Sequence, residues 1–146
     1  MDRLIEEFVQ GKRLAIVGLS RSGKKFGNIA YKELRTRGYT LYPVHPQAQE
    51  VDGARCYPNL AALPDKVDGV LVSVPPQKAK AVLQEAATAG IKNVWLQQGS
   101  ESGEVIALAK QLGLNVVSGK CILMYAPPVR GAHGLHRFVV KLIGQL

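Results

Sequence analysis

The chain has 146 residues, of which 47% are hydrophobic and 21% charged, so we expect a single globular domain over residues 1–146 with a complete core. It lacks a run of about 18 apolar residues, and its two cysteines form no CxxC pair. Its first residues lack the cationic segment and apolar stretch of a signal peptide, so we expect none. These features exclude a membrane span, a disulfide scaffold and a zinc knuckle, and they predict a cytoplasmic protein. The formal net charge of +8 favours an anionic partner, either nucleic acid or a phosphorylated metabolite.

Short apolar segments alternate with helical patterns through the first part of the chain. Compact apolar runs that end at glycine are typical of strands covered on both faces, and apolar residues spaced three and four apart indicate helices. The pattern predicts a helix over 2–10, a strand over 13–17, a loop over 19–27, a helix carrying Phe26, Ile29, Ala30 and Leu34 that ends at Gly38, and a strand over 39–44.

The same alternation continues through the rest of the chain. Prolines can open a helix because the first turn needs no amide donor, and glycines can end one. The pattern predicts a strand over 67–74, a helix from Pro75-Pro76 to Gly90, a strand over 93–96, a helix ending at Gly113, a strand over 115–118 and an amphipathic helix over 135–143.

Strands that alternate with helices predict the fold class. Parallel strands need crossover connections, which helices usually supply. We therefore expect an α/β, Rossmann-like, doubly wound parallel sheet of five strands in a single domain. Ligands of such sheets bind beyond the carboxyl ends of the strands, where the strand order reverses. The residues that follow each strand are thus the candidates for a site.

The loop after the first strand concentrates groups that bind anions. Glycine permits a tight turn and a close ligand approach, and the amides at the start of the next helix favour an anion. Cationic side chains stand there although the helix dipole disfavours them, which suits a polyanionic ligand. The alternative is an ordinary glycine turn with solvated lysines. The predicted phosphate-binding residues are Gly18, Ser20, Arg21, Ser22, Gly23, Lys24 and Lys25.

This loop departs from the dinucleotide fingerprint. Its spacing is Gly18-x-Ser20-x-x-Gly23 in place of G-x-G-x-x-G, and the second strand ends at His45 where a ribose diol needs Asp or Glu. An imidazole can instead donate to a phosphate or stack beside an adenine. NAD is therefore disfavoured, whereas a ribose-phosphate nucleotide is compatible with these residues.

Three other strand ends carry further candidates. The second ends in a histidine and a proline that are either turn residues or ligand contacts. The third ends in an apolar rim that suits a base or a pantetheine arm and also starts a helix. The fourth ends in two amides that can hydrogen-bond a neutral polar group. The candidate ligand residues at these ends are His45, Pro46, Val74, Pro75, Gln97 and Gln98.

Neither a catalytic residue nor a metal ligand is predicted. Cys121 is a plausible nucleophile, but no histidine or acid is placed in the sequence to activate it, and a buried structural cysteine is the alternative. His133 and His136 fall on neighbouring turns of the last predicted helix without an acidic or thiol ligand beside them. A surface or docking role is the alternative for these two histidines.

The remaining basic residues do not indicate a nucleic-acid site. Lys32, Arg35 and Arg37 continue the basic character along the helix after the glycine loop. Neither a helix-turn-helix nor a zinc finger nor an interleaved aromatic platform accompanies them. We therefore expect these three side chains to be solvated helix surface, and we expect no nucleic-acid partner.

Several blocks of residues, in chain order, resemble a known family. The blocks are Ile16-Val17-Gly18-Leu19-Ser20, Lys25-Phe26-Gly27-Asn28, Gly38-Tyr39, Tyr42-Pro43-Val44-His45-Pro46, Val94-Trp95-Leu96-Gln97-Gln98-Gly99 and Gly119-Lys120-Cys121. Together they resemble the small stand-alone CoA-binding proteins, whose domain is similar to the CoA-binding domain of the succinyl-CoA synthetase alpha subunit. The resemblance runs nearly the whole chain. Gly23 stands where many relatives have proline, and His45 where many have asparagine.

This resemblance implies a ligand and a set of contacts. Residues 20–23 would hold the phosphates of CoA, His45-Pro46 and Val74-Pro75 would flank the nucleotide, and Gln97-Gln98 would lie near the site. The ligase relatives add a domain with a phosphorylated histidine and a subunit that binds a nucleoside triphosphate, and we expect neither here. The resemblance therefore implies binding of coenzyme A or an acyl-CoA without catalysis, as in a carrier, sensor or subunit.

Two other functions stay open from the residues. One is an NADP-dependent or acyl-transfer enzyme that uses Cys121 or a partner, and the other is a nucleotide-responsive protein-interaction module that uses the C-terminal helix. The expected partner is a small-molecule CoA ligand, with neither nucleic acid nor membrane. A homodimer and an unidentified protein partner are both left open. The acyl group, the pathway and the oligomeric state do not follow from the sequence.

Overall fold

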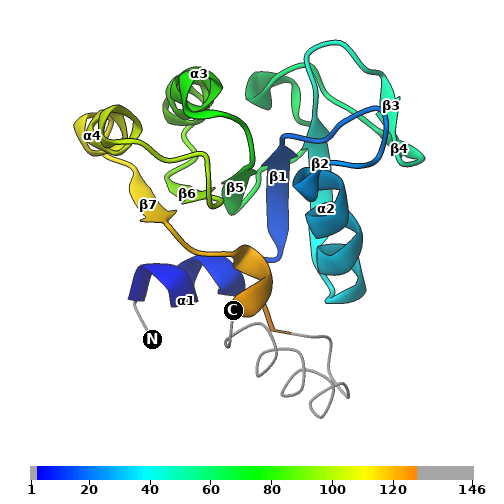
Figure 1. Cartoon of the computed structure of the whole chain (residues 1–146), viewed down its shortest axis with the longest axis horizontal. Coiled ribbons are helices and arrows are strands. Elements are labelled where there is room, and N and C mark those ends of the chain that lie inside the picture. Colours follow the sequence, from blue (N-terminus) through cyan, green and yellow to red (C-terminus); the bar gives the residue numbers. More distant parts are fainter. Residues whose placement is uncertain (1–2, 128–146) are drawn as a thin grey trace.

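The computed structural model describes residues 3–127 and shows a central sheet between two helical layers (Figure 1). The sheet has five parallel strands, which confirms the Rossmann-like α/β fold expected from the sequence. Its strands are β1 (Arg13–Val17), β2 (Thr40–Val44), β5 (Gly69–Val72), β6 (Asn93–Leu96) and β7 (Asn115–Ser118). The helices that cover it are α1 (Arg3–Gln10), α2 (Phe26–Thr36), α3 (Pro76–Thr88) and α4 (Gly103–Gln111).

The strand order contains one reversal. The order is β2-β1-β5-β6-β7, so the chain passes from β1 to β2 at one edge and then returns to pair β5 with the other side of β1. The register places Ile16 beside Pro43 on one side and beside Leu71 on the other. The carboxyl ends of β1 and β5 therefore flank the position where doubly wound sheets bind their ligands.

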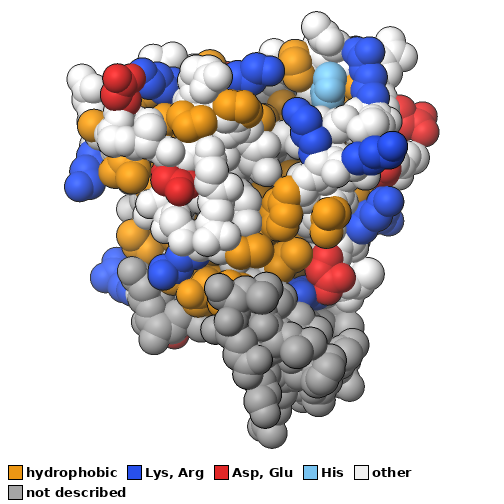
Figure 2. All heavy atoms as spheres, in the orientation of Figure 1, with side chains coloured by type: hydrophobic (Ala, Val, Ile, Leu, Met, Phe, Trp, Pro, Cys, Tyr) orange, Lys and Arg blue, Asp and Glu red, His pale blue; other side chains and the backbone are white. Residues whose placement is uncertain are grey.

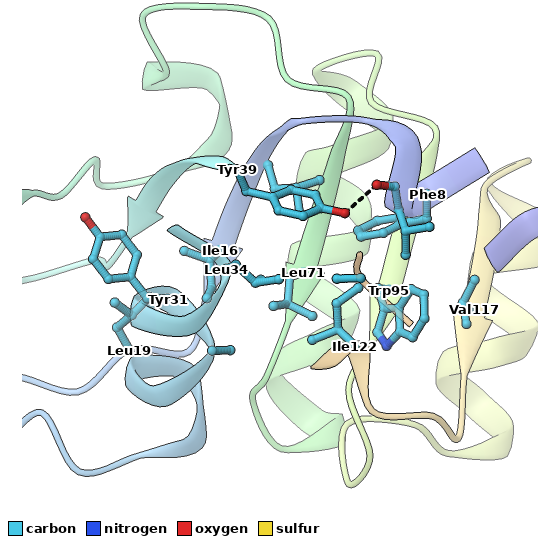
Figure 3. Close-up of a cluster of buried hydrophobic side chains, with 14 of the residues drawn as sticks. Phe8, Ile16, Leu19, Tyr31, Leu34, Tyr39, Leu71, Trp95, Val117 and Ile122 are labelled. Carbon is cyan, nitrogen blue, oxygen red and sulfur yellow. Dashed lines mark hydrogen bonds between the residues drawn. The ribbon is translucent and has the colours of Figure 1, made fainter. Parts of the chain in front are cut away.

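Two apolar layers hold the helices against the sheet. On the face covered by α1 and α2, Trp95 is fully buried, and its ring centroid lies 5.3 Å from that of Phe8 (Figure 3). On the opposite face, α3 and α4 bury Leu83 and Val105 in a second cluster. Because both faces are covered, the central strands are continuous apolar runs in the sequence.

The connection between β2 and β5 contains elements that the sequence pattern did not predict. β3 (Glu50–Val51) and β4 (Ala54–Arg55) form an antiparallel hairpin around Asp52-Gly53, and a short 3-10 helix, η1 (Leu60–Ala62), follows. Strands this short have too little alternation to be recognised. The strand predicted over 67–74 is shorter at both ends in the structure.

Arg37 is buried, although we expected it on the solvated surface of the helix. Its side chain is 7% exposed rather than solvated, and its Nη1 donates to the carbonyl oxygens of Leu123 at 2.8 Å and Ala126 at 2.9 Å. Its Nε donates to Glu33 Oε1 at 2.9 Å. Arg37 thus joins the end of α2 to a second 3-10 helix, η2 (Ile122–Met124). The helix predicted over 135–143 lies outside the described residues.

Candidate functional site

The loops that follow β1 and β5 meet at the reversal of strand order. Gly18 has a φ of +123°, and a Cβ atom there would lie 2.1 Å from the carbonyl oxygen of Ser73. A Cβ atom on Gly27, at the start of α2, would lie 2.5 Å from the carbonyl oxygen of Gly18. Glycine is required at both positions because the backbones approach so closely. This packing brings the N-terminus of α2 against the ends of both strands.

Asn28 fixes the backbone of the loop. Its side chain is fully buried, its Oδ1 accepts from Ser20 N at 2.9 Å, and its Nδ2 donates to Ser20 O at 3.0 Å. The same Nδ2 donates to Asp52 Oδ2 at 2.8 Å. The amide of Gly23 donates to Ser20 O at 3.1 Å and closes the turn. The loop over residues 18–25 therefore has a defined backbone conformation around Ser20.

The charged side chains of this loop face solvent, whereas Leu19 is buried in the core. The Oγ atoms of Ser20 and Ser22 lie 2.8 Å apart, and the amide of Ser22 donates to Ser20 Oγ at 3.1 Å. Arg21, Lys24 and Lys25 are exposed, and none of the ion pairs within residues 3–127 involves them. Their charges are therefore available to a ligand at the start of α2.

The N-terminus of α2 has no cap of its own. Lys25 occupies the N-cap position with an extended backbone, its side chain makes no capping hydrogen bond, and the first turn contains no acidic residue. A helix start usually carries a side-chain acceptor or an acid that compensates its free amides and dipole. The start of α2 is instead complementary to an anion from outside the chain.

His45 joins this positive region from the end of β2. Its Nδ1 accepts from the amides of Gln47 at 3.1 Å and Ala48 at 2.9 Å, so the proton of the neutral ring lies on Nε2. Partial burial, together with the nearby charges of Arg21 and Lys25, lowers the pKa of His45. Figure 2 shows Lys and Arg side chains gathered around the histidine. The loops after β1 and β2 thus share one positive surface.

A hollow lies beside His45. Its volume is about 680 Å³, and it is bordered by the exposed Pro46, by the hairpin residues Gly53 and Arg55 and by the buried Cys56. The hollow lies along the connection between β2 and the hairpin, and its charged lining residues are Glu50 and Arg55.

The loop after β5 forms the apolar rim that the sequence predicted. Val74 is half-buried and Pro75 is exposed at the start of α3. Ser100, which the sequence pattern did not single out, fixes this rim. Its Oγ accepts from the amide of Val74 at 3.0 Å and donates to the carbonyl oxygen of Val72 at 3.2 Å.

Gln97 and Gln98 have different environments. The side chain of Gln97 is 4% exposed, and its Oε1 accepts from the amide of Ile122 at 3.1 Å. Gln98 is exposed, with its Nε2 3.5 Å from the carbonyl oxygen of Gly119. Gln97 therefore supports η2 from inside the protein, whereas Gln98 lies at the surface near the end of β7.

The cysteines form no disulfide and are unequally accessible. Cys56 is buried and Cys121 is half-buried, and burial raises the pKa of the Cys56 thiol. Within residues 3–127, no group of three or more His, Cys, Asp or Glu side chains is arranged to hold a metal ion. None of the helices in that same range has the length and apolar character that a membrane crossing needs. His133 and His136 lie outside the described residues.

Asp52 and the buried Asn28 are further site-forming residues that sequence reasoning missed. An Asp-Gly pair between short apolar residues is a recognised hairpin signal, and Asp52-Gly53 matches it. This signal could have predicted the turn of the β3-β4 hairpin. It could not have predicted that the Asp52 carboxylate reaches Asn28 on α2, because that contact depends on how the hairpin packs.

Comparison with known proteins identifies the family. The sequence model of the CoA binding domain matches residues 12–127, which is most of the chain. The chain belongs to this CoA-binding domain family. Among solved structures, it is similar to a protein from Pyrococcus horikoshii OT3 at 34% sequence identity, with a TM-score of 0.77, over 84% of this chain and 87% of that one.

Two curated relatives differ in size. YneT from Bacillus subtilis is 29% identical, and the match covers 81% of this chain and 88% of YneT. The acetate-CoA ligase (ADP-forming) II subunit alpha from Pyrococcus furiosus is 26% identical, and the match covers 82% of this chain but 28% of that subunit. The chain therefore spans only a little over a quarter of the ligase subunit that it matches.

Proposed function

We propose that this protein, acting as one domain over residues 1–146, binds coenzyme A or an acyl-CoA and carries out no chemistry of its own. The observation that carries the proposal is the start of α2, which has no internal cap or acid and is surrounded by exposed cations at the reversal of strand order. Membership in the CoA-binding domain family supports coenzyme A as the anion that binds there.

In this proposal the phosphates of CoA bind the loop over residues 18–25. Gly18 and Gly23 let the backbone approach the ligand, and the cations Arg21, Lys24 and Lys25 form charge-assisted hydrogen bonds. The hydroxyls of Ser20 and Ser22 bond each other, and the hydrogen that this bond leaves over is donated to the ligand. The fit rests on three observations: the glycine backbone, the exposed hydroxyls and the cations without an ion-pair partner in the described part of the chain.

The rest of the ligand would extend along the neighbouring strand ends. His45 can donate from Nε2 to a phosphate or ribose oxygen, and Pro46 borders the adjacent hollow. Val74 and Pro75 supply an apolar surface for the base or the pantetheine arm. Gln98 is the exposed amide of its pair, so it would make the direct contact, while Gln97 would act by holding η2.

The relatives favour a binding role within a larger process. One relative is the alpha subunit of a ligase named for acetate and CoA, and the present chain matches 28% of it. A CoA-binding unit of this kind can serve as a carrier, a sensor or a subunit that works with another protein. We propose a protein partner on this ground, and the residues named above are assigned to ligand binding alone.

Thermal unfolding with a panel of ligands tests the function. Ligand at about 100 times its dissociation constant should stabilise the fold by about 2.7 kcal/mol. We expect a shift of the unfolding temperature with CoA and acetyl-CoA, a smaller shift with NADP and none with NAD. Stabilisation by NADP alone would overturn the proposal. Cys121→Ser should leave CoA binding unchanged, and a loss of binding or a covalent CoA adduct at Cys121 would contradict a purely binding role.

A further inference from the structure

The turn of the β3-β4 hairpin contacts the loop that we assign to phosphate binding. Asp52 Oδ2 accepts from Asn28 Nδ2 at 2.8 Å, and a Cβ atom on Gly23 would lie 3.2 Å from Asp52 Oδ1. Lys32 Nζ lies 4.0 Å from Asp52 Oδ1. The hairpin, the glycine loop and α2 therefore converge on one carboxylate.

The Asp52 carboxylate lies where its negative charge is unfavourable for binding an anionic ligand. A negative side chain beside an anion-binding loop repels the ligand, and Coulomb repulsion over a few ångströms is appreciable near a protein surface. Asp52 also has a φ of +52°, the left-handed region that most residues avoid, and no other non-glycine residue within residues 3–127 has a positive φ. The Asp-Gly turn accounts for this backbone conformation, but the position of the charge is unfavourable unless the side chain has a compensating role.

The compensating role is the hydrogen bond that Asp52 accepts from Asn28. Asn28 accepts from Ser20 N and donates to Ser20 O, so the orientation of its amide sets the backbone at the centre of the loop. Its Nδ2 carries two hydrogens, of which one is directed to Ser20 O and the other to the Asp52 carboxylate. A carboxylate accepts without donating, so it permits only this orientation of the buried amide.

We propose that Asp52 is a positioning residue for CoA binding, which acts through Asn28 to hold the loop over residues 18–25 in its binding conformation. The inference rests on the proposed function, because the ligand is the one assigned there. The hairpin is then part of the binding machinery although it lies outside the strand ends where such sheets bind ligands. Asp52 itself contacts no phosphate.

Whether Asp52 variants bind CoA more weakly or more tightly than the wild type distinguishes a positioning role of Asp52 from simple charge repulsion. Asp52→Gly removes the side chain and suits the positive φ, whereas Asp52→Asn keeps an acceptor for Asn28 Nδ2 and removes only the charge. If Asp52 acts only as a repulsive charge, both variants should bind CoA more tightly. If it positions the loop, Asp52→Gly should bind about tenfold more weakly, which corresponds to the loss of one part-buried charge-assisted hydrogen bond. Asp52→Asn should bind as well as or better than the wild type.

Isothermal titration of CoA into the wild type, both Asp52 variants and Asp65→Ala gives this comparison. Asp65 is an exposed carboxylate that bonds Tyr42, so its variant matches the change in net charge away from the loop. Tighter binding by Asp52→Gly, or equal binding by Asp52→Gly and the wild type, would overturn the proposal. If Asp52→Gly does not fold, Asp52→Ser, whose side chain is shorter by one bond, replaces it.

Amide hydrogen exchange of the protein without ligand tests whether Asp52 positions the loop over residues 18–25. In Asp52→Gly the amides of Ser20 and Gly23 should exchange about tenfold faster than in the wild type, while those of Ile16 and Val72 in the sheet stay protected. In Asp52→Asn all four amides should keep their protection. Unchanged exchange at Ser20 in Asp52→Gly would refute the positioning role even if CoA does not bind. Absence of CoA binding by the wild type would instead refute the proposed function.

Discussion

The loops from β1 into α2 and from β6 into α4 start two helices at the same edge of one sheet, but they compensate the helix ends differently. At α4, the hydroxyl of Ser102 accepts from the amide of Val105 at 3.2 Å, and Glu104 lies in the first turn. At α2, Lys25 stands at the N-cap without a side-chain bond, and the first turn has no acid. The start of α4 is therefore capped by a side chain and has an acid in its first turn, whereas the start of α2 has neither.

The polar groups of the two loops also point to different places. In the β6-α4 loop, Ser100 and Gln97 bond to neighbouring backbone inside the protein. In the β1-α2 loop, Arg21 and Lys25 face solvent, and only the backbone around Ser20 is held from inside. One loop uses its side chains to stabilise the fold. The other concentrates like charges at a locally unfavourable position, which is understandable if a polyanion binds there.

The first prediction compares one glycine from each of the two loops. Gly18→Ala should lower the free energy of unfolding by about 3 kcal/mol, because its Cβ would meet the Ser73 carbonyl at 2.1 Å and its φ is +123°. Gly99→Ala also has a positive φ, +97°, but no atom lies within 4 Å of the new Cβ, so it should cost about 1 kcal/mol. Urea denaturation of both variants measures the difference. Equal costs would mean that the two loops do not differ in backbone packing.

The second prediction concerns the charges. The double variant Arg21→Ala, Lys25→Ala should weaken CoA binding at least about 100-fold, since each charge-assisted hydrogen bond contributes roughly 1.5–3 kcal/mol. Its affinity should also depend less on salt than that of the wild type. The matched control is Lys66→Ala, Lys110→Ala, which removes the same net charge from other parts of the surface. If both double variants lose affinity equally, the effect comes from net charge and the loop is not the phosphate site.

The third prediction concerns the N-cap residues of α2 and α4. Lys25→Ser gives α2 an N-cap side chain and should raise the free energy of unfolding by about 0.5–1 kcal/mol while weakening CoA binding. Ser102→Ala removes the cap of α4 and should lower the free energy of unfolding by about 1 kcal/mol without changing CoA affinity. Denaturation and titration calorimetry together test the pair. A Lys25→Ser protein that binds CoA as tightly as the wild type would show that the uncapped helix start is not used for the ligand.

The smallest expected effect is a pH dependence that arises from His45. Burial, Arg21 and Lys25 lower its pKa from the ordinary value of 6.5, so the folded protein keeps the ring neutral at pH values where the unfolded chain protonates it. The free energy of unfolding should therefore fall as the pH drops below 6.5 towards the folded pKa, and this slope should be smaller in His45→Asn. An NMR titration gives the pKa directly, and Arg21→Ala, Lys25→Ala should move it back towards 6.5. A His45 pKa above 6.5 in the wild type would contradict the assigned surroundings.

Local patterns were sufficient for the five strands, the helices between them and the concentration of cations in the first loop. Strands such as β6 are buried on both faces, so burial leaves a continuous apolar run in the sequence that needs no tertiary information to be read. Glycines and cations that follow such a strand directly are placed at the carboxyl edge by topology alone. The pattern of residues was therefore enough to assign Gly18 to Lys25 to one loop at that edge.

The partners of particular polar side chains were decided only by tertiary structure. Arg37 resembled a solvated cation, yet it is buried against the carbonyls of Leu123 and Ala126, and Gln97 resembled a ligand contact, yet it holds Ile122. Asp52 lay in a connection without periodicity and reaches Asn28 on α2. A hydrogen bond depends on distance and angle between groups far apart in the chain, whereas burial of an apolar face repeats with the period of the backbone. The sequence by itself therefore determined the sheet and the charge at its edge, and the packing of the hairpin and η2 determined which side chains hold that edge in place.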